Sequence, residues 1–225
     1  MTRAMTTAVV VVAVVTASAL GAGCSQTGTS MGGSAMAAPA MTTSGTKAAG
    51  LRSGLNNLLQ EHVYLAAAAT GAALDGRDAE FKAAAAALDQ NSIAISKAIG
   101  SVYGMDAELA FLPLWRRHIG FAVDYTVGVA TSDKTRADKA VSDLIGYTED
   151  FGAFLASANP NLPKGVVASL VKHHVVTLKN VIDAQASKDP TRAYMALRTA
   201  AGHMPMIADP LAEAIVKQFP DKFAG

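Results

Sequence analysis

LLQEHV (residues 58–63) returns in altered form as LWRRHI (114–119) and once more as LVKHHV (170–175). The fifth residue of each copy is a histidine, and His118 follows His62 by the same 56 residues by which His174 follows His118. A fixed period of this length is typical of tandem repeats, in which every copy is one supersecondary unit. Other apolar positions share the period, namely Ile95, Phe151 and Ile207, then Ile99, Leu155 and Leu211.

Each copy has the apolar spacing of an amphipathic helix followed by a break and a second helix. The breaks at 75–78, 132–135 and 187–190 combine Asp with Gly, Lys or Pro, which is chemistry typical of helix caps. We therefore predict an all-α fold, a six-helix bundle of three tandem hairpins of about 56 residues with ferritin-like or four-helix-bundle-type packing. The expected first arms are 50–75, 105–131 and 164–186, and the second arms are 78–102, 134–158 and 190–218.

The first 23 residues have the features of an export signal. Arg3 supplies a positive start, Ala8 to Val15 is an unbroken apolar run, and small residues precede Cys24. This order is similar to a lipobox, so residues 1–23 are predicted to be a lipoprotein signal peptide and Cys24 the site of the lipid, with palmitate among its acyl chains. The chain would then lie at the extracytoplasmic face of the cell membrane. The alternative is an ordinary secretory signal followed by a free thiol.

Residues 24–47 are rich in Gly, Ser, Thr, Ala and Met, which predicts a flexible tether ahead of the bundle domain at 48–225. Met31, Met36 and Met41 recur every five residues, either as ordinary linker residues or as soft ligands that collect Cu(I). Loss of residues 1–23 would remove Arg3 alone from 19 basic and 18 acidic side chains. A balanced chain of this kind is not expected to bind nucleic acid.

All five histidines fall inside predicted helices. His62, His118 and His174 belong to the apolar stripes, so three equivalent imidazoles would meet if the repeats pack around a common centre. Buried imidazoles need hydrogen-bond partners or a cation, because leaving them unpaired costs about 1–3 kcal/mol each. The sequence therefore predicts a buried metal centre, with separate hydrogen bonds from each histidine to backbone carbonyls as the alternative.

The last repeat carries a second group of potential ligands within residues 202–210. His203 and Met206 are one turn apart, Met204 lies between them, and Pro205 is expected to kink the helix. Nitrogen with thioether sulfur suits copper better than Mg, Ca or structural Zn, although both methionines are also ordinary core residues. Four residues near His62, His118 and His174 in the sequence are candidate partners that would orient the imidazoles. They are Glu61, Asp124, Tyr125 and His173.

Four segments carry a resemblance to a known group of proteins: LWRRHIGFAVDY (114–125), QEH (60–62), HMPM (203–206) and QFPDKF (218–223). They resemble exported bacterial helical-repeat proteins that often bear the label copper amine oxidase, over residues 50–224. The resemblance implies that His62, His118, His174, His203, Met204 and Met206 are the functional positions. Amine oxidases of that name form their quinone from a tyrosine that follows asparagine within a large β-rich domain, and no Asn-Tyr pair occurs in this chain.

The combined expectation is a lipid-anchored protein of the cell envelope that binds, buffers or hands on copper, with another exported metalloprotein as its partner. Two alternatives stay open. A structural bundle that docks a partner would use the histidines for stability only. A di-iron or haem enzyme would need iron ligands inside the bundle, and di-iron bundles use a Glu-x-x-His pattern that is not found at Glu61 and His62. Enzymatic activity is therefore not the leading expectation.

Overall fold

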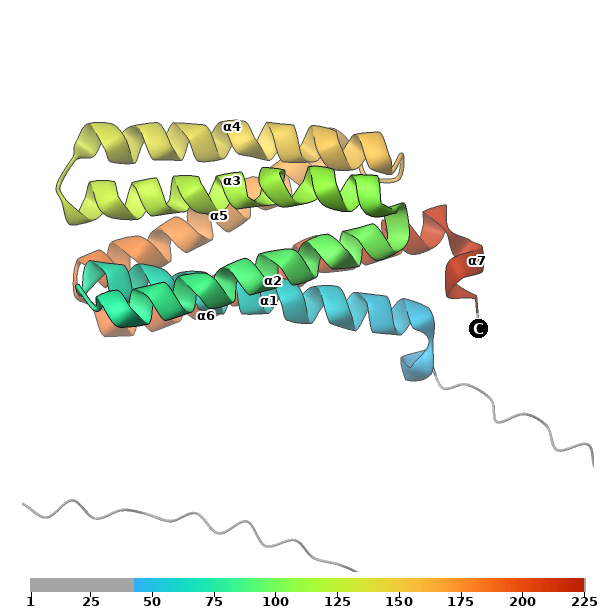
Figure 1. Ribbon diagram of the computed structural model, residues 1–225, viewed down its shortest axis with the longest axis horizontal. Helices are drawn as coiled ribbons and strands as arrows, with labels where there is room; N and C mark the ends of the chain where they lie inside the picture. Colours follow the sequence, from blue (N-terminus) through green and yellow to red (C-terminus); the bar gives the residue numbers. More distant parts are fainter. Residues whose placement is uncertain (1–42, 225) are drawn as a thin grey trace, which may run out of the picture. The chain divides into compact units, whose positions relative to one another are not determined.

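The computed structural model describes residues 43–224, which form six long helices and two short ones (Figure 1). The long helices are α1 (Lys47–Leu74), α2 (Asp78–Tyr103), α3 (Met105–Ala130), α4 (Lys134–Ala158), α5 (Lys164–Ala186) and α6 (Pro190–Gln218). The 3-10 turn η1 (Thr43–Gly45) precedes α1, and α7 (Pro220–Phe223) follows α6. The predicted all-helical bundle is confirmed, although η1 and α7 have no counterpart among the predicted helices. The finer, ferritin-like packing stays a prediction.

The pattern of contacts between helices is the same in each of the three sequence repeats. Each helix packs against the next one along the chain, and α6 returns to pack against α1, so that the six long helices form a closed ring of contacts. The helices α1, α3 and α5 also contact one another. They are therefore the inner helices, and side chains at equivalent positions on them can meet at the centre of the bundle.

The turns inside the three repeats have the same backbone shape. Gly76, Ser132 and Lys188 occupy equivalent positions and all have positive φ, at 67°, 57° and 57°. After the second and third of these turns, Asp133 and Asp189 cap the next helix, accepting hydrogen bonds from the amides of Arg136 and Arg192. The predicted capping function of the breaks is confirmed at these two positions. In the first repeat the residue that precedes α2 is Arg77, whose side chain makes no such bond.

Replacing Ser132 by glycine is expected to raise the free energy of unfolding by about 1 kcal/mol, because only glycine adopts a left-handed conformation without steric cost. Ser132 is exposed at the turn between α3 and α4, so the substitution removes little packing. Urea denaturation of Ser132→Gly beside the unmodified chain measures the effect. Gly76→Ala is the matched variant at the equivalent position and should change stability in the opposite direction. A loss of stability in Ser132→Gly would contradict this account of the turn.

Small residues allow the two helices of a repeat to approach closely. A Cβ added at Gly128 of α3 would lie 2.7 Å from the backbone nitrogen of Ala137 in α4. The equivalent positions in the other repeats are Ala72 and Ala184, and both are fully buried. All three repeats therefore have a small residue at this position, where their two helices are in contact.

Several predicted features lie outside the described residues. They are the signal peptide, Cys24, the greater part of the tether and the three methionines at 31, 36 and 41. Within residues 43–224, no helix combines the length and the apolar character that crossing a membrane requires. Helix α6 continues through both Pro205 and Pro210 to Gln218, so the prolines do not end it.

Candidate metal centre

The three equivalent histidines meet inside the bundle, as the sequence period predicts. His62, His118 and His174 come from the inner helices α1, α3 and α5 and are 2%, 5% and 7% exposed. The Nε2 atoms of His62 and His118 are 3.3 Å apart. One ring nitrogen of each histidine lies within 4.8 Å of one ring nitrogen of both others. The group is the one arrangement of three or more His, Cys, Asp or Glu ligands suited to a metal among residues 43–224.

Apolar and aromatic side chains surround the group. Trp115, one turn before His118, contacts the rings of both His118 and His62 edge-on, at centroid distances of 4.6 and 5.0 Å. Tyr147 of α4 stacks on His118 at 5.0 Å. The imidazoles are thus removed from water and fixed in orientation by large neighbours.

The hydrogen bonds of this group are incomplete. The Nδ1 atoms of His62, His118 and His174 are buried and have no hydrogen-bond partner of normal geometry among the described residues. The phenol of Tyr147 and the indole nitrogen of Trp115 are likewise buried without a partner from residues 43–224. Each such group costs about 1–3 kcal/mol. Buried polar atoms without a partner are unusual in folded proteins and indicate a place where a water molecule or an ion binds.

Burial keeps the three imidazoles neutral. It lowers the pKa of His118 to about 3 and the pKa of His174 to about 4, with smaller effects from His174 and His203 respectively. The carbonyl of Trp115 opposes the shift at His118. Burial also holds the pKa of His62 well below its ordinary value, and both other histidines add to this. Neutral imidazole is the form that binds metals, so the group is ready to bind one at any pH above about 5.

The spacing of the nitrogens suits a small metal ion. Metal–nitrogen bonds of about 2.0–2.1 Å in tetrahedral geometry place two ligand nitrogens about 3.3–3.5 Å apart. His62 and His118 already have this separation at 3.3 Å. The third nitrogen, on His174, lies within 4.8 Å of the other two and would have to move closer to complete such a site. The arrangement can therefore hold one ion with three imidazole ligands.

A cavity of about 40 Å³ adjoins the three histidines. Its walls come from equivalent positions of the repeats, including Leu59, Trp115 and Val171 from the inner helices. Met204 of α6, which is 1% exposed, also lines it. A second cavity of about 20 Å³ touches His118 and His174 from the other side. Both are large enough for a water molecule or an ion and far too small for an organic cofactor.

The second helix of each repeat carries a polar residue at an equivalent position, and of the three the sequence analysis identified only His203. Asn91 donates a hydrogen bond to the carbonyl of Leu58, and His203 binds the carbonyl of Leu170, both at 3.0 Å. The acceptors precede His62 and His174 by one turn. The equivalent residue in the second repeat is Tyr147, so the positions 91, 147 and 203 have the same period as the histidines. That recurrence of polar side chains is the signal by which the sequence could have identified them.

Of the remaining predicted ligands, only Met204 lies beside the three histidines. His203 is 9% exposed and lies against the exposed His173, with 4.3 Å between ring centroids. Met206 is 57% exposed, whereas its neighbour Met204 faces the cavity. His203 and Met206, which were predicted to share a face, thus differ in exposure, and Met206 does not reach the buried group. Met204 and Met206 point in different directions because they are two residues apart on a helix.

The predicted orienting residues have other partners. Glu61 accepts a hydrogen bond from Asn91, and Asp124 forms an ion pair with Arg136. Tyr125 lines the smaller cavity but donates its hydrogen bond to Asp183 at 2.5 Å. None of these three contacts an imidazole nitrogen of the group through a hydrogen bond between described residues, so the predicted role is wrong for them.

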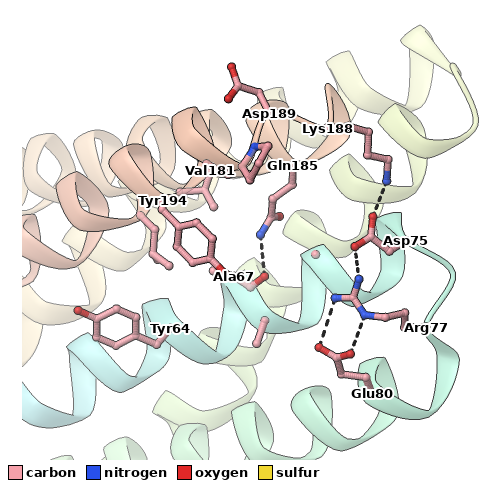
Figure 2. A pocket seen from close by; sticks show the side chains of 15 residues that line it. Tyr64, Ala67, Asp75, Arg77, Glu80, Val181, Gln185, Lys188, Asp189 and Tyr194 are labelled. Carbon is pink, nitrogen blue, oxygen red and sulfur yellow. Dashed lines mark hydrogen bonds and ion pairs between the residues drawn. The ribbon is translucent and has the colours of Figure 1, made fainter. Parts of the chain in front are cut away.

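A larger groove of about 480 Å³ lies on the surface, where α1 and the turn between α5 and α6 meet the start of α2 (Figure 2). Its charged residues satisfy one another: Asp75 binds both Arg77 and Lys188, and Arg77 also binds Glu80. Gln185 spans the groove to donate to the carbonyl of Ala67, as Figure 2 shows. No histidine lines this groove, so its size does not make it the metal centre.

Comparison of the chain with known protein families, with characterised proteins and with solved structures yields no match. The function is therefore inferred from the arrangement of the side chains of this chain.

Proposed function

We propose that the protein binds copper as Cu(I) through His62, His118 and His174, and that it buffers the ion or hands it on. The observation that carries the proposal is the buried cluster of three neutral imidazoles whose hydrogen bonds are incomplete. An ion between the rings would bind one nitrogen of each, and at His62 and His118 these are the Nε2 atoms that face each other. The export signal and Cys24 add the second part of the proposal, a lipid-anchored protein at the outer face of the cell membrane.

The charge of the group favours a monovalent ion. The cluster contains three neutral ligands, and no carboxylate or thiolate of residues 43–224 belongs to it. A divalent ion would bury two uncompensated charges among apolar and aromatic side chains, which is costly. Cu(I) buries one charge, and imidazole and thioether ligands both suit it.

Met204 offers a soft fourth ligand. It is buried and lines the same cavity as the three histidines, so its thioether can approach an ion held there. Three nitrogens with one sulfur form a donor set that favours Cu(I) over Mg²⁺ or Ca²⁺. Haem does not fit a cavity of about 40 Å³, and a di-iron centre would require carboxylates in the group.

Copper binding is tested by titrating the purified chain with Cu(I) without oxygen against a coloured chelator. One ion per chain is expected. His62→Gln should weaken the affinity by about 100-fold or more, because loss of even an indirect metal contact costs up to that amount. Circular dichroism shows that the variant is folded.

Two matched pairs sharpen the test. Lys172→Gln changes an exposed residue of the same helix as His174 and should leave the equilibrium affinity unchanged. Met204→Leu should weaken Cu(I) binding more than Met206→Leu, because Met204 faces the cavity and Met206 faces solvent. Equal affinity in the unmodified chain and in His62→Gln would show that copper, if bound, is not bound here. No retained Cu(I) would leave the structural role of the histidines as the better account.

A further inference from the structure

The two histidines outside the buried group lie together in the third repeat. His173 of α5 is exposed, His203 of α6 is 9% exposed, and their rings are 4.3 Å apart. His203 binds the carbonyl of Leu170 through Nε2. A carbonyl only accepts, so Nε2 carries the proton and Nδ1 carries the lone pair. A histidine that donates one ring N–H to a backbone carbonyl and presents the other nitrogen is the usual form of a metal ligand.

The residue types of this pair differ from those at the equivalent positions of the other two repeats. The equivalent residues of the first repeat are Glu61 and Asn91, which are joined by a hydrogen bond of 2.7 Å. In the second repeat they are Arg117 and Tyr147, and the guanidinium lies over the phenol ring at 6.0 Å. The equivalent position is thus occupied by a carboxylate–amide pair in the first repeat, by a cation over an aromatic ring in the second, and by two imidazoles in the third. Only the imidazole pair offers two nitrogen ligands.

The imidazole pair adjoins the buried group. The carbonyl that His203 binds belongs to Leu170, one turn before His174. The next residue after His203 is Met204, which lines the cavity beside the three histidines. His203 is also close enough to contribute to the lowered pKa of His174. His203 thus lies against the exposed His173, and its neighbour Met204 lines the cavity of the buried group.

The backbone of α6 is weakened at the same point. Pro205 has no N–H to donate to the carbonyl of Ala201, and Pro210 has none for the carbonyl of Met206. A helix that lacks these bonds opens locally at lower cost than one that has them. The segment that lacks these two bonds, residues 201–210, thus carries His203 and Met204.

We propose that His173 and His203 form an outer two-nitrogen site for Cu(I), through which the ion reaches and leaves the buried centre. This inference rests on the proposed function, since it concerns the route to the same three histidines. The transfer exchanges ligands without oxidation: the ion leaves the nitrogens of His173 and His203 as it gains those of the inner group. It predicts that the outer pair controls the rate of loading, whereas the inner group controls the affinity.

The test uses the purified chain and stopped-flow transfer of Cu(I) from a coloured chelator. The double variant His173→Gln, His203→Asn should load and release copper at least about tenfold more slowly, as expected from the loss of metal contacts. Its equilibrium affinity should equal that of the unmodified chain, because a route does not alter the end states. Asparagine at 203 copies Asn91, which makes the equivalent hydrogen bond, so the fold keeps this contact.

Arg117→Gln is the matched control, because it changes the position equivalent to His173 in the second repeat and is not expected to slow loading. Unchanged rates in the double variant, together with intact copper binding, would overturn the route and leave the proposed function standing. An unmodified chain that binds no Cu(I) would overturn both. A fall in affinity equal to the fall in rate would place His173 and His203 in the equilibrium site and overturn their role as a route.

Discussion

The free energy of unfolding is expected to fall by about 4 kcal/mol or more when the pH is lowered from 7.5 to 5. The cause is the burial of His118 and His174, whose pKa values in the folded chain are about 3 and 4. In the unfolded chain a histidine has a pKa of about 6.5. Below that value the unfolded chain binds protons that the folded chain does not, so acid favours unfolding by about 2 kcal/mol for each of the two at pH 5.

The size of this effect makes it easy to measure by urea denaturation of the metal-free chain at both pH values. The loss begins near pH 6.5 and continues towards the folded pKa values, and His62 adds to it in the same direction. A range that ends at pH 5 avoids most carboxylate titration, including that of Asp75 and Glu80, whose pKa values ion pairing lowers.

The double variant His118→Leu, His174→Leu separates the cluster from other titrating groups. It should lose most of the pH dependence, because leucine carries no proton in either state. Met206→Leu, at an exposed position of α6, should keep the pH dependence, because it changes no titrating group. Equal stability of the unmodified chain at pH 7.5 and pH 5 would show that the three imidazoles become protonated in the folded bundle, contrary to their burial.

Cu(I) is expected to stabilise the fold by about 4 kcal/mol when its free concentration is a thousand times the dissociation constant. For a domain of this size the melting temperature should rise by about 8–16 °C. The ion would bind the folded chain selectively, because the unfolded chain does not hold the three imidazoles together. Thermal unfolding followed by circular dichroism, with and without Cu(I), measures the shift.

Removal of the metal should reverse the stabilisation. Addition of a stronger Cu(I) chelator is expected to restore the melting temperature of the metal-free chain. In His62→Gln the same amount of copper should give little or no increase. A rise of equal size in that variant would indicate binding elsewhere, for example at exposed methionines such as Met206.

The long helices could be predicted from the sequence because the same pattern is written three times. Apolar spacing and the capping residues at 132–135 and 187–190 define the helix ends in the second and third repeats. Because the repeats have the same length, the helix ends of the first repeat are expected at the equivalent positions. The meeting of His62, His118 and His174 follows from the same period, since equivalent residues on three inner helices face one centre. Repetition thus supplied long-range information that a single helix does not contain.

Other parts of the site depend on which helices become neighbours, and local sequence does not specify that choice. Tyr125 and Asp124 both lie near His118 in the sequence. In the folded chain, however, Tyr125 donates a hydrogen bond to Asp183 of α5, and Asp124 forms an ion pair with Arg136 of α4. On α6 the apolar spacing is also ambiguous, since Met204 and Met206 flank a proline and are equally apolar. Only the packed bundle distinguishes the methionine that faces the cavity from the one that faces solvent.

The closed ring of helix contacts ties metal capture to completion of the fold. Each imidazole belongs to a different repeat, so a chain with one or two repeats in place presents at most two of the three. The proposed copper centre would therefore be incomplete in an incompletely folded chain. Occupancy of the centre then acts as a marker of a finished molecule.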